Sequence, residues 1–281
     1  MTRLDNLRKA LLCFGLLLFC APMVWGARQT ANGLSTPEQF KDDFQNVLCK
    51  DKERLGAVKI LFEKMGAEAS DITVEKKRGV ENVVIRKPGT AEGIIVVGAH
   101  YDKAGDGCGA VDNWTGIVAI AHVYRSLKKM SLNKTVLFMA FGAEEMGLVG
   151  SRGMASAINK EEVSRYCAMI NIDSLGLSVP QAADNMSTPK LLGLAEELAK
   201  EMKMPFGHSA IDGANSDSSA FIERKIPAIT IHGMTDDWRK ILHSINDQAS
   251  KVNPTSVYLG YRLVLALVSR LDTVACDAYR R

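Results

Sequence analysis

Metal-ligand side chains follow three apolar segments of this 281-residue chain. His100 comes after the apolar run at 94–97, Glu144 and Glu145 after TVLFMAF (135–141), and Asp173 after the run at 168–172. Neighbouring strands lie about 4.8 Å apart, so parallel strands would bring these side chains together. Carboxylates gathered there would repel one another and raise their pKa values unless a cation were present. The sequence therefore predicts a divalent metal site at the carboxyl edge of a parallel sheet.

Two aspartates after His100, within GAHYDKAGDGCGAVDNWTG (98–116), extend this set. Asp112 precedes an amphipathic segment, and the dipole of the expected helix N-terminus favours a carboxylate there. Asp102, two residues beyond His100 in an extended chain, is placed to accept the second imidazole N–H. Imidazole and carboxylate ligands without thiolate suit an open, catalytic zinc site. The excess of carboxylates allows two zinc ions bridged by one carboxylate.

Strand and helix patterns alternate along the chain, which predicts an α/β fold: a single domain with a mainly parallel, twisted central sheet and helices on both faces. Expected strands lie at 72–75, 82–85, 93–98, 135–141, 168–172 and 228–231. Helical patterns run from Thr36 to about Met65 with breaks, and over 113–130, 146–158 and 216–224. Two more helices are expected after the caps Thr188-Pro189 and Asn253-Pro254.

Composition and charge narrow the classes of function. Hydrophobic residues make up 47% and charged residues 24% of the chain, as in folded globular domains. Arg3, Arg8 and Lys9 against Asp5 give residues 1–26 a net charge of +2, so the rest carries +1 of the total +3. This small, scattered charge argues against a nucleic-acid partner.

The N-terminus has the parts of a secretory signal peptide over residues 1–26: a basic start, an apolar stretch at 10–20 and small residues at Gly26 and Ala27. The alternative is an uncleaved anchor, but the stretch is short for a membrane span of about 20 residues. We expect a secreted or periplasmic monomer without stable membrane association after cleavage. Cleavage would leave four cysteines with three possible disulfide connectivities, and Cys167 could instead be a buried free thiol: Cys49, Cys108, Cys167 and Cys276.

Five blocks then carry a family resemblance: GAHYD, AVDNWTG, FGAEEMGLVGS, NIDSLG and LHSIND. In their order and spacing they resemble the secreted zinc aminopeptidases of the bacterial leucyl aminopeptidase type. These are co-catalytic zinc exopeptidases, a family that also includes glutaminyl cyclases. Each block alone is weak, whereas five in order are specific. The resemblance covers nearly all of the mature chain and is strongest from Gly93 to Asp247.

The resemblance implies that residues 27–281 form a zinc aminopeptidase-like catalytic domain. His100 and Asp173 would bind one zinc ion, Glu145 and His243 a second, and Asp112 would bridge the two. Glu144 would be the general base. Asp102, which its spacing places beside His100, is the second residue predicted to be catalytic. The implied activity is hydrolysis of N-terminal residues from peptides or proteins with a free N-terminus, by metal-activated water.

Some points stay open. No apolar strand delivers His243, so His232 and His208 compete with it as ligands. Where the family often has Ser-Asp-His, this chain has Ser216-Asp217-Ser218, which affects the substrate pocket rather than the ligands. The loops after Asp173 and around 211–221 are expected to form that pocket. The alternatives are a single-zinc glutaminyl-peptide cyclotransferase, a carboxypeptidase or dipeptidase of the same fold, and a catalytically dead binding module.

Overall fold

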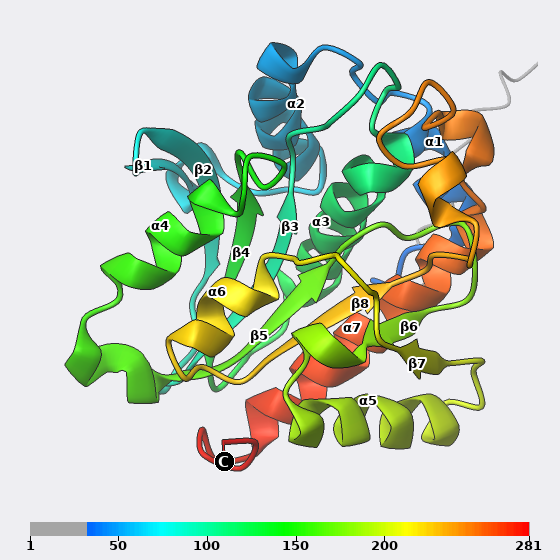
Figure 1. Cartoon of the computed structure of the whole chain (residues 1–281). Coiled ribbons are helices and arrows are strands. Elements are labelled where there is room, and N and C mark those ends of the chain that lie inside the picture. Colours follow the sequence, from blue (N-terminus) through cyan, green and yellow to red (C-terminus); the bar gives the residue numbers. More distant parts are fainter. Residues whose placement is uncertain (1–32, 281) are drawn as a thin grey trace, which may run out of the picture.

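An eight-stranded sheet with the order β1-β2-β4-β3-β5-β8-β6-β7 runs through the protein (Figure 1). The computed structural model describes residues 33–280, so the predicted signal peptide at 1–26 lies outside the described residues. The strands are β1 Ile72–Lys77, β2 Val80–Lys87, β3 Ile94–His100, β4 Thr135–Phe141, β5 Tyr166–Ile172, β6 Gln181–Ala183, β7 Gly207–Ser209 and β8 Ala228–His232.

The four central strands β4, β3, β5 and β8 are parallel, and β1, β2 and β6 add antiparallel pairs. His100 of β3 is in register with Phe141 of β4, so these strands end side by side. β1 and β2 form a hairpin closed by Arg78 and Gly79, whose positive φ angles of 51° and 81° match the twist of the strands. The predicted fold class is confirmed.

Helices cover both faces of the sheet (Figure 1), because alternate side chains of its buried strands are apolar on both sides. In β4, Phe138 packs into the larger core with α1, α2, α3, α5 and α7, whereas Met139 and Phe141 pack with α4 and α6. The helices are α1 Pro37–Phe44, α2 Asp51–Lys64, α3 Thr115–Leu127, α4 Val149–Ala157, α5 Pro189–Glu201, α6 Ser218–Glu223 and α7 Pro254–Thr273.

Three predicted helices begin later than their sequence patterns indicate, among them α6, which starts at Ser218 rather than at residue 216. Leu148 adopts a left-handed backbone with φ 61°, so α4 starts at Val149 rather than at residue 146. A turn at Ala110–Trp114 precedes α3, and Asn113, the expected first residue of this helix, has non-helical dihedral angles within it, so α3 starts at Thr115. The short strands β6 and β7 were not predicted, because three residues each are too few to show a period.

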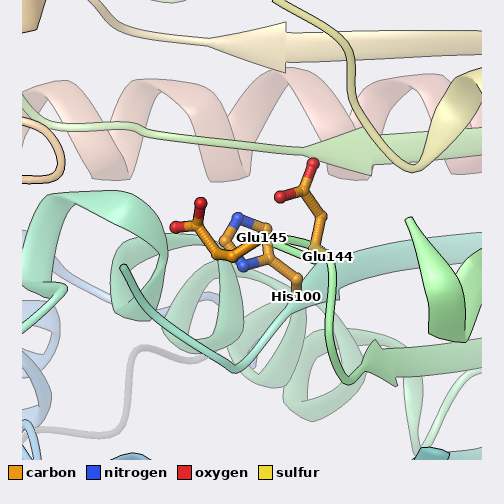
Figure 2. A group of neighbouring side chains, drawn as sticks. All are labelled: His100, Glu144 and Glu145. Atoms are coloured by element: carbon orange, nitrogen blue, oxygen red, sulfur yellow. The ribbon is translucent and has the colours of Figure 1, made fainter. Parts of the chain in front are cut away.

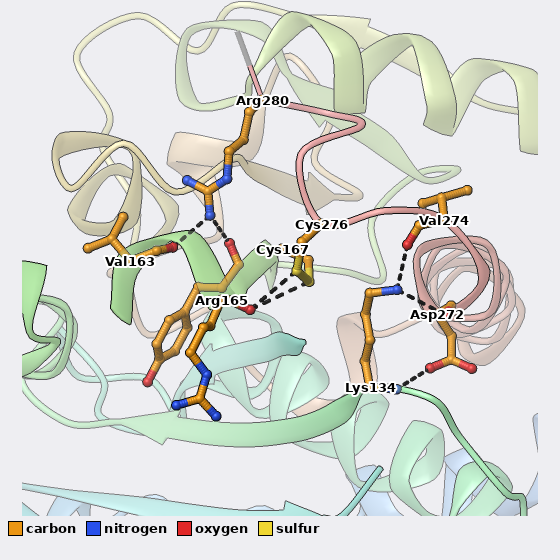
Figure 3. Close-up of a disulfide and its surroundings, with 9 residues drawn as sticks. Lys134, Val163, Arg165, Cys167, Asp272, Val274, Cys276 and Arg280 are labelled. Atoms are coloured by element: carbon orange, nitrogen blue, oxygen red, sulfur yellow. Dashed lines mark hydrogen bonds between the residues drawn. A yellow bond between two sulfur atoms is a disulfide. The ribbon is translucent and has the colours of Figure 1, made fainter. Parts of the chain in front are cut away.

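Two disulfides, Cys49–Cys108 and Cys167–Cys276, settle the pairing that the sequence left open. The alternative of a free Cys167 thiol is therefore wrong: this strand residue is bonded to the segment that follows α7 (Figure 3). The other bond links the N-terminal side of α2 to the loop between His100 and Asp112. No helix within residues 33–280 is long and apolar enough to cross a membrane.

Candidate metal centre

The carboxyl ends of the central strands place three of the predicted ligands. His100 is the last residue of β3, and Asp173 directly follows β5, where its N–H donates to the Ile231 carbonyl of β8 at 2.9 Å. Glu144 and Glu145 lie in the turn after β4. Because these strands are parallel neighbours, residues more than 70 positions apart converge at one edge of the sheet.

His100 and two aspartates form a first group of possible ligands. The imidazole Nε2 lies 3.1 Å from Asp112 Oδ1 and 3.6 Å from Asp173 Oδ1. One donor atom from each residue lies within 4.8 Å of the others. The His100 side chain is 1% exposed, so its ring is held at the floor of the site.

His243, the predicted ligand that the strands do not deliver, lies in a second group of possible ligands with Asp112 and Glu145. Its Nε2 lies 3.0 Å from Asp112 Oδ2 and 3.1 Å from Glu145 Oε2. Its rival His208 is instead paired with Asp184 and Glu196 at the surface. The other rival, His232, lines the same pocket but belongs to neither group.

The turn that carries the two glutamates is held by Asp102. Its carboxylate accepts the backbone N–H groups of Glu144 at 3.0 Å and of Glu145 at 3.1 Å. The two glutamate carboxylates consequently point to different sides of the His100 ring (Figure 2). Asp102 also meets His100 Nδ1, where its main-chain carbonyl at 3.2 Å is nearer than its carboxylate at 3.5 Å. Asp102 therefore orients both the imidazole and the glutamate turn.

The electrostatics of these groups reflect an excess of negative charge. Burial, reinforced by the charges of Asp217 and Asp173, raises the pKa of Glu144 to about 10. Burial alone would lower the pKa of His100, but the charge of Glu144 and hydrogen bonds to the aspartates raise it well above its usual value. Hydrogen bonds to Asp112 and Glu145 raise the pKa of His243 to about 10. A cation would relieve this imbalance, so the donor set fits a divalent metal.

A pocket of about 310 Å³ opens onto these residues. His100, Asp112, Glu144, Glu145, Asp173 and His243 line one part of it. Its other walls include a set of apolar side chains, namely Leu148, Met186, Ile211, Met234, Trp238 and Leu242. The loops after Asp173 and around 211–221 do contribute to this pocket, through Ser174 and through Ile211, Gly213, Ala214 and Asn215. A substrate could thus place an apolar group beside the metal ligands.

Two residues that sequence reasoning gave no role support the ligands from behind. Ser216 Oγ donates to Asp173 Oδ2 at 2.6 Å, which fixes the orientation of that carboxylate. Asn113 Nδ2 donates to the Ile172 carbonyl at 2.8 Å, and its Oδ1 accepts the Ser174 N–H at 3.1 Å. Asn113 therefore ties the Asp112 turn to the end of β5. Asn113 lies in the AVDNWTG block and Ser216 in the Ser216-Asp217-Ser218 segment, but neither carries a charge that would have marked its role.

Sequence comparisons show aminopeptidases among the relatives of this chain. It is 31% identical to leucine aminopeptidase 2 of Trichophyton rubrum over 170 residues, which are 56% of this chain and 34% of that protein. It is 35% identical to aminopeptidase YwaD of Bacillus subtilis over 107 residues, which are 37% of this chain and 24% of that protein. The chain thus spans about a third or less of the length of these curated relatives.

Solved structures share the fold. LapB from Legionella pneumophila has a TM-score of 0.74 at 23% identity and covers 85% of this chain and 73% of its own. A glutaminyl cyclase from an Acidobacteriales bacterium has a TM-score of 0.72 at 18% identity and covers 86% of this chain and 94% of its own. The model of peptidase family M28 matches residues 82–268, which is well over half of the sequence, and the chain therefore belongs to this family.

Proposed function

We propose that this protein is a zinc-dependent aminopeptidase that releases N-terminal residues from peptides or proteins. The observation that carries the proposal is the position of Asp112. Its Oδ1 faces His100 Nε2 at 3.1 Å, and its Oδ2 faces His243 Nε2 at 3.0 Å. A carboxylate whose two oxygens face separate ligand groups suits a bridge between two metal ions. Membership of a peptidase family supports peptides as the substrate class.

In this proposal His100 and Asp173 would hold one ion, Glu145 and His243 would hold the other, and Asp112 would be shared between them. Bound zinc would supply the positive charge that polarises the scissile carbonyl and makes the attacking water more acidic. The same charge would bring the raised pKa of Glu144 down towards the working pH. The Glu144 carboxylate then takes a proton from the water and donates it to the leaving amine.

Substrate selection follows from the two parts of the pocket. The acidic side chains attract the positively charged α-amine of a free N-terminus, which explains release of single terminal residues. The apolar walls, including Met186, Met234 and Trp238, accept the side chain of that residue. The leucine aminopeptidases among the relatives support a preference for large apolar N-terminal residues.

An assay of aminoacyl amides and peptides, with free or acetylated N-termini, tests the proposal. We expect release of the first residue from free N-termini, fastest for large apolar residues, and no release from acetylated substrates. A chelator should abolish the reaction, and added zinc should restore it. Cleavage of acetylated substrates, or turnover that a chelator leaves intact, would contradict the proposal.

The same panel separates the nearest alternative. A glutaminyl-peptide cyclotransferase would convert an N-terminal glutaminyl peptide to pyroglutamate without releasing the residue, a difference that mass spectrometry distinguishes. Peptides blocked only at the carboxyl end separate an aminopeptidase from a carboxypeptidase. Cyclisation without hydrolysis, or cleavage that depends on a free carboxyl end, would replace the proposed activity with the corresponding alternative.

Asp112→Asn tests the bridging role directly. Loss of one charged oxygen from the shared ligand should lower zinc content and turnover together, since both ions use this residue. Elemental analysis of the purified variant gives the zinc content. An unchanged zinc content would remove Asp112 from the metal centre.

We further propose that the protein works outside the cytoplasm, as a monomer, after removal of residues 1–26. The two disulfides support an oxidising compartment. N-terminal sequencing of protein collected from the periplasm or medium should begin at Ala27, and sedimentation should give the mass of one chain. A chain that retains Met1 and sediments with membranes would indicate an uncleaved anchor.

A further inference from the structure

Asp247 links the two ligand groups without lining the pocket. It lies four residues after His243 and is 2% exposed. Its Oδ1 accepts the Val111 N–H at 2.6 Å, and its Oδ2 accepts the Asp112 N–H at 3.1 Å. Its main-chain carbonyl accepts the Cys108 N–H at 2.8 Å. One residue thus joins the loop of His243 to the turn that carries Asp112.

Arg54 of α2 holds the segment that leads into the same turn. Its side chain is fully buried, and its guanidinium donates from Nη1 to the Cys108 carbonyl at 2.8 Å and from Nη2 to the Gly109 carbonyl at 3.1 Å. Its Nε donates to the Tyr101 carbonyl, directly after His100. The planar fork of arginine can reach several carbonyls at once, which a lysine ammonium does less well. Arg54 therefore ties the end of β3 to the turn of Asp112.

The two loops that these residues join are packed backbone against backbone. A Cβ atom added at Gly105 would lie 2.3 Å from the His243 carbonyl oxygen, and one added at Gly107 would lie 2.3 Å from that of Ser244. Such close approach leaves no room for side chains between the loops. The disulfide from Cys49 fastens the same segment at Cys108. A displacement of either loop would therefore be transmitted to the ligand on the other.

We propose that Asp247 and Arg54 are positioning residues that hold Asp112 and His243 at metal-binding distance from each other. They act through the backbone, because their polar atoms bond to N–H and carbonyl groups on the rear side of the turn. The inference rests on the proposed function, since it concerns the same metal ions. Substitution of residues that hold metal ligands in position commonly lowers metal affinity by about 10–100-fold.

Asp247→Asn tests the inference, with Asp272→Asn as a matched control. Asp272 is also buried, and its carboxylate accepts two consecutive backbone N–H groups, those of Asn133 at 3.1 Å and Lys134 at 2.7 Å. Asp272 lies at the end of α7 and bonds to the residues just before β4 (Figure 3), whereas the candidate metal centre lies at the carboxyl ends of the strands. Each amide places an NH₂ group where one backbone N–H needs an acceptor, so both variants carry the same local defect.

Zinc dissociation constants, measured on the full-length protein by competition with a chelator, provide the readout. We expect Asp247→Asn to bind zinc at least about 10-fold more weakly than the wild type, and Asp272→Asn to stay within about twofold. Arg54→Lys, which keeps the charge but loses the fork, should fall between them. Equal zinc affinity in the wild type and Asp247→Asn, or an equal loss in the two aspartate variants, would overturn the inference.

The inference can be tested even if a variant fails to fold without metal. If Asp247→Asn is unfolded without metal, the quantity to compare is the zinc concentration that restores its folded circular dichroism spectrum, in place of the dissociation constant. Failure to fold at saturating zinc would overturn the inference, because the defect would then lie in the fold as a whole. The wild type separates the two proposals: absence of zinc binding there would refute the metal centre itself, whereas a zinc-binding wild type with an unaffected Asp247→Asn would refute only the positioning role.

Discussion

His100 and His122 are both buried histidines bonded to aspartates, but their surroundings differ in charge and in access. His100 meets several carboxylates at a pocket, and its pKa is raised. His122 of α3 is fully buried, and burial, despite the opposing effect of Asp43, lowers its pKa. Its Nε2 donates to Asp43 Oδ2 at 2.9 Å, and its Nδ1 accepts from the Ser35 hydroxyl at 2.6 Å.

The closed cluster around His122 is balanced, whereas the open one around His100 is not. Asp43 has one more partner, the Lys64 ammonium, so its single negative charge is compensated. The cluster has the serine, histidine and aspartate of a hydrolytic triad, but Ser35 is 2% exposed and no substrate can reach it. The comparison shows that unbalanced acidic charge together with a pocket is typical of a metal site, whereas balanced charge around a fully buried histidine is typical of a structural cluster.

Metal removal should have the largest effect on stability, and this effect should depend on the cluster around His100 and not on the cluster around His122. Zinc at about 1,000 times its dissociation constant would stabilise the folded protein by about 4.1 kcal/mol, because the unfolded chain has no formed site. We expect a chelator to lower the unfolding temperature of the wild type and of Asp43→Asn by the same amount. Thermal unfolding followed by circular dichroism provides the test. An unfolding temperature that is insensitive to the chelator would contradict a metal centre.

Replacing one carboxylate by its amide in each cluster should give opposite results. Glu144→Gln removes the proposed general base and should lower kcat by at least about 10²-fold while zinc remains bound. Asp43→Asn, the matched change in the closed cluster, should leave kcat within about twofold. Steady-state kinetics with elemental analysis gives both values. Full turnover by zinc-loaded Glu144→Gln would remove Glu144 from the proposed mechanism.

The free energy of unfolding should show the reverse order, with a larger loss in Asp43→Asn than in Glu144→Gln. Asp43→Asn loses charge-assisted hydrogen bonds to His122 and Lys64, which should lower the free energy of unfolding by roughly 2 kcal/mol. Glu144→Gln exchanges a carboxyl group whose pKa burial raises to about 10 in the metal-free protein for a neutral amide of similar shape, so the metal-free protein should not lose stability. Urea unfolding in the presence of a chelator measures both. A larger loss in Glu144→Gln than in Asp43→Asn would break the comparison.

A pH series should resolve the smallest effect. His122 has a lowered pKa in the folded protein, so the unfolded chain takes up a proton first as the pH falls below about 6.5. The contribution of His122 to the free energy of unfolding is therefore complete above that pH. It is lost as the pH falls towards the pKa of His122 in the folded protein, at no more than about 1.4 kcal/mol per pH unit. The difference in unfolding free energy between the wild type and His122→Gln, both metal-free, should shrink over this range. A constant difference would contradict a neutral, buried His122.

Much of the fold and of the candidate site was open to prediction because local patterns encode it. The apolar runs of β3, β4 and β5 mark strands buried on both faces, and polar residues follow where each run stops. Parallel pairing then brings His100, Glu145 and Asp173 together. The pattern located helix starts less well: α3 and α4 begin later because backbone dihedral angles at Asn113 and Leu148 interrupt the helix without changing the apolar spacing.

His243 marks the limit of such prediction. It follows no buried strand, and only its family-like block distinguished it from His208 and His232. In the structure its ring meets Asp112 because the loop that carries it packs on the segment around Gly105 and is tied there by Asp247. This contact joins residues more than 130 positions apart, and neither strand periodicity nor local spacing encodes it.

By itself, the sequence determined the order of strands and helices, the carboxylate-rich strand ends and the family resemblance, because these depend on residue types at short spacing. Only the tertiary structure decided which cysteines pair, which histidine joins Asp112 and which buried histidine, His100 or His122, stands at a pocket. The physical reason is that charge balance and access are properties of neighbours in space. The chain brings those neighbours together only when the sheet, its helices and its loops have packed.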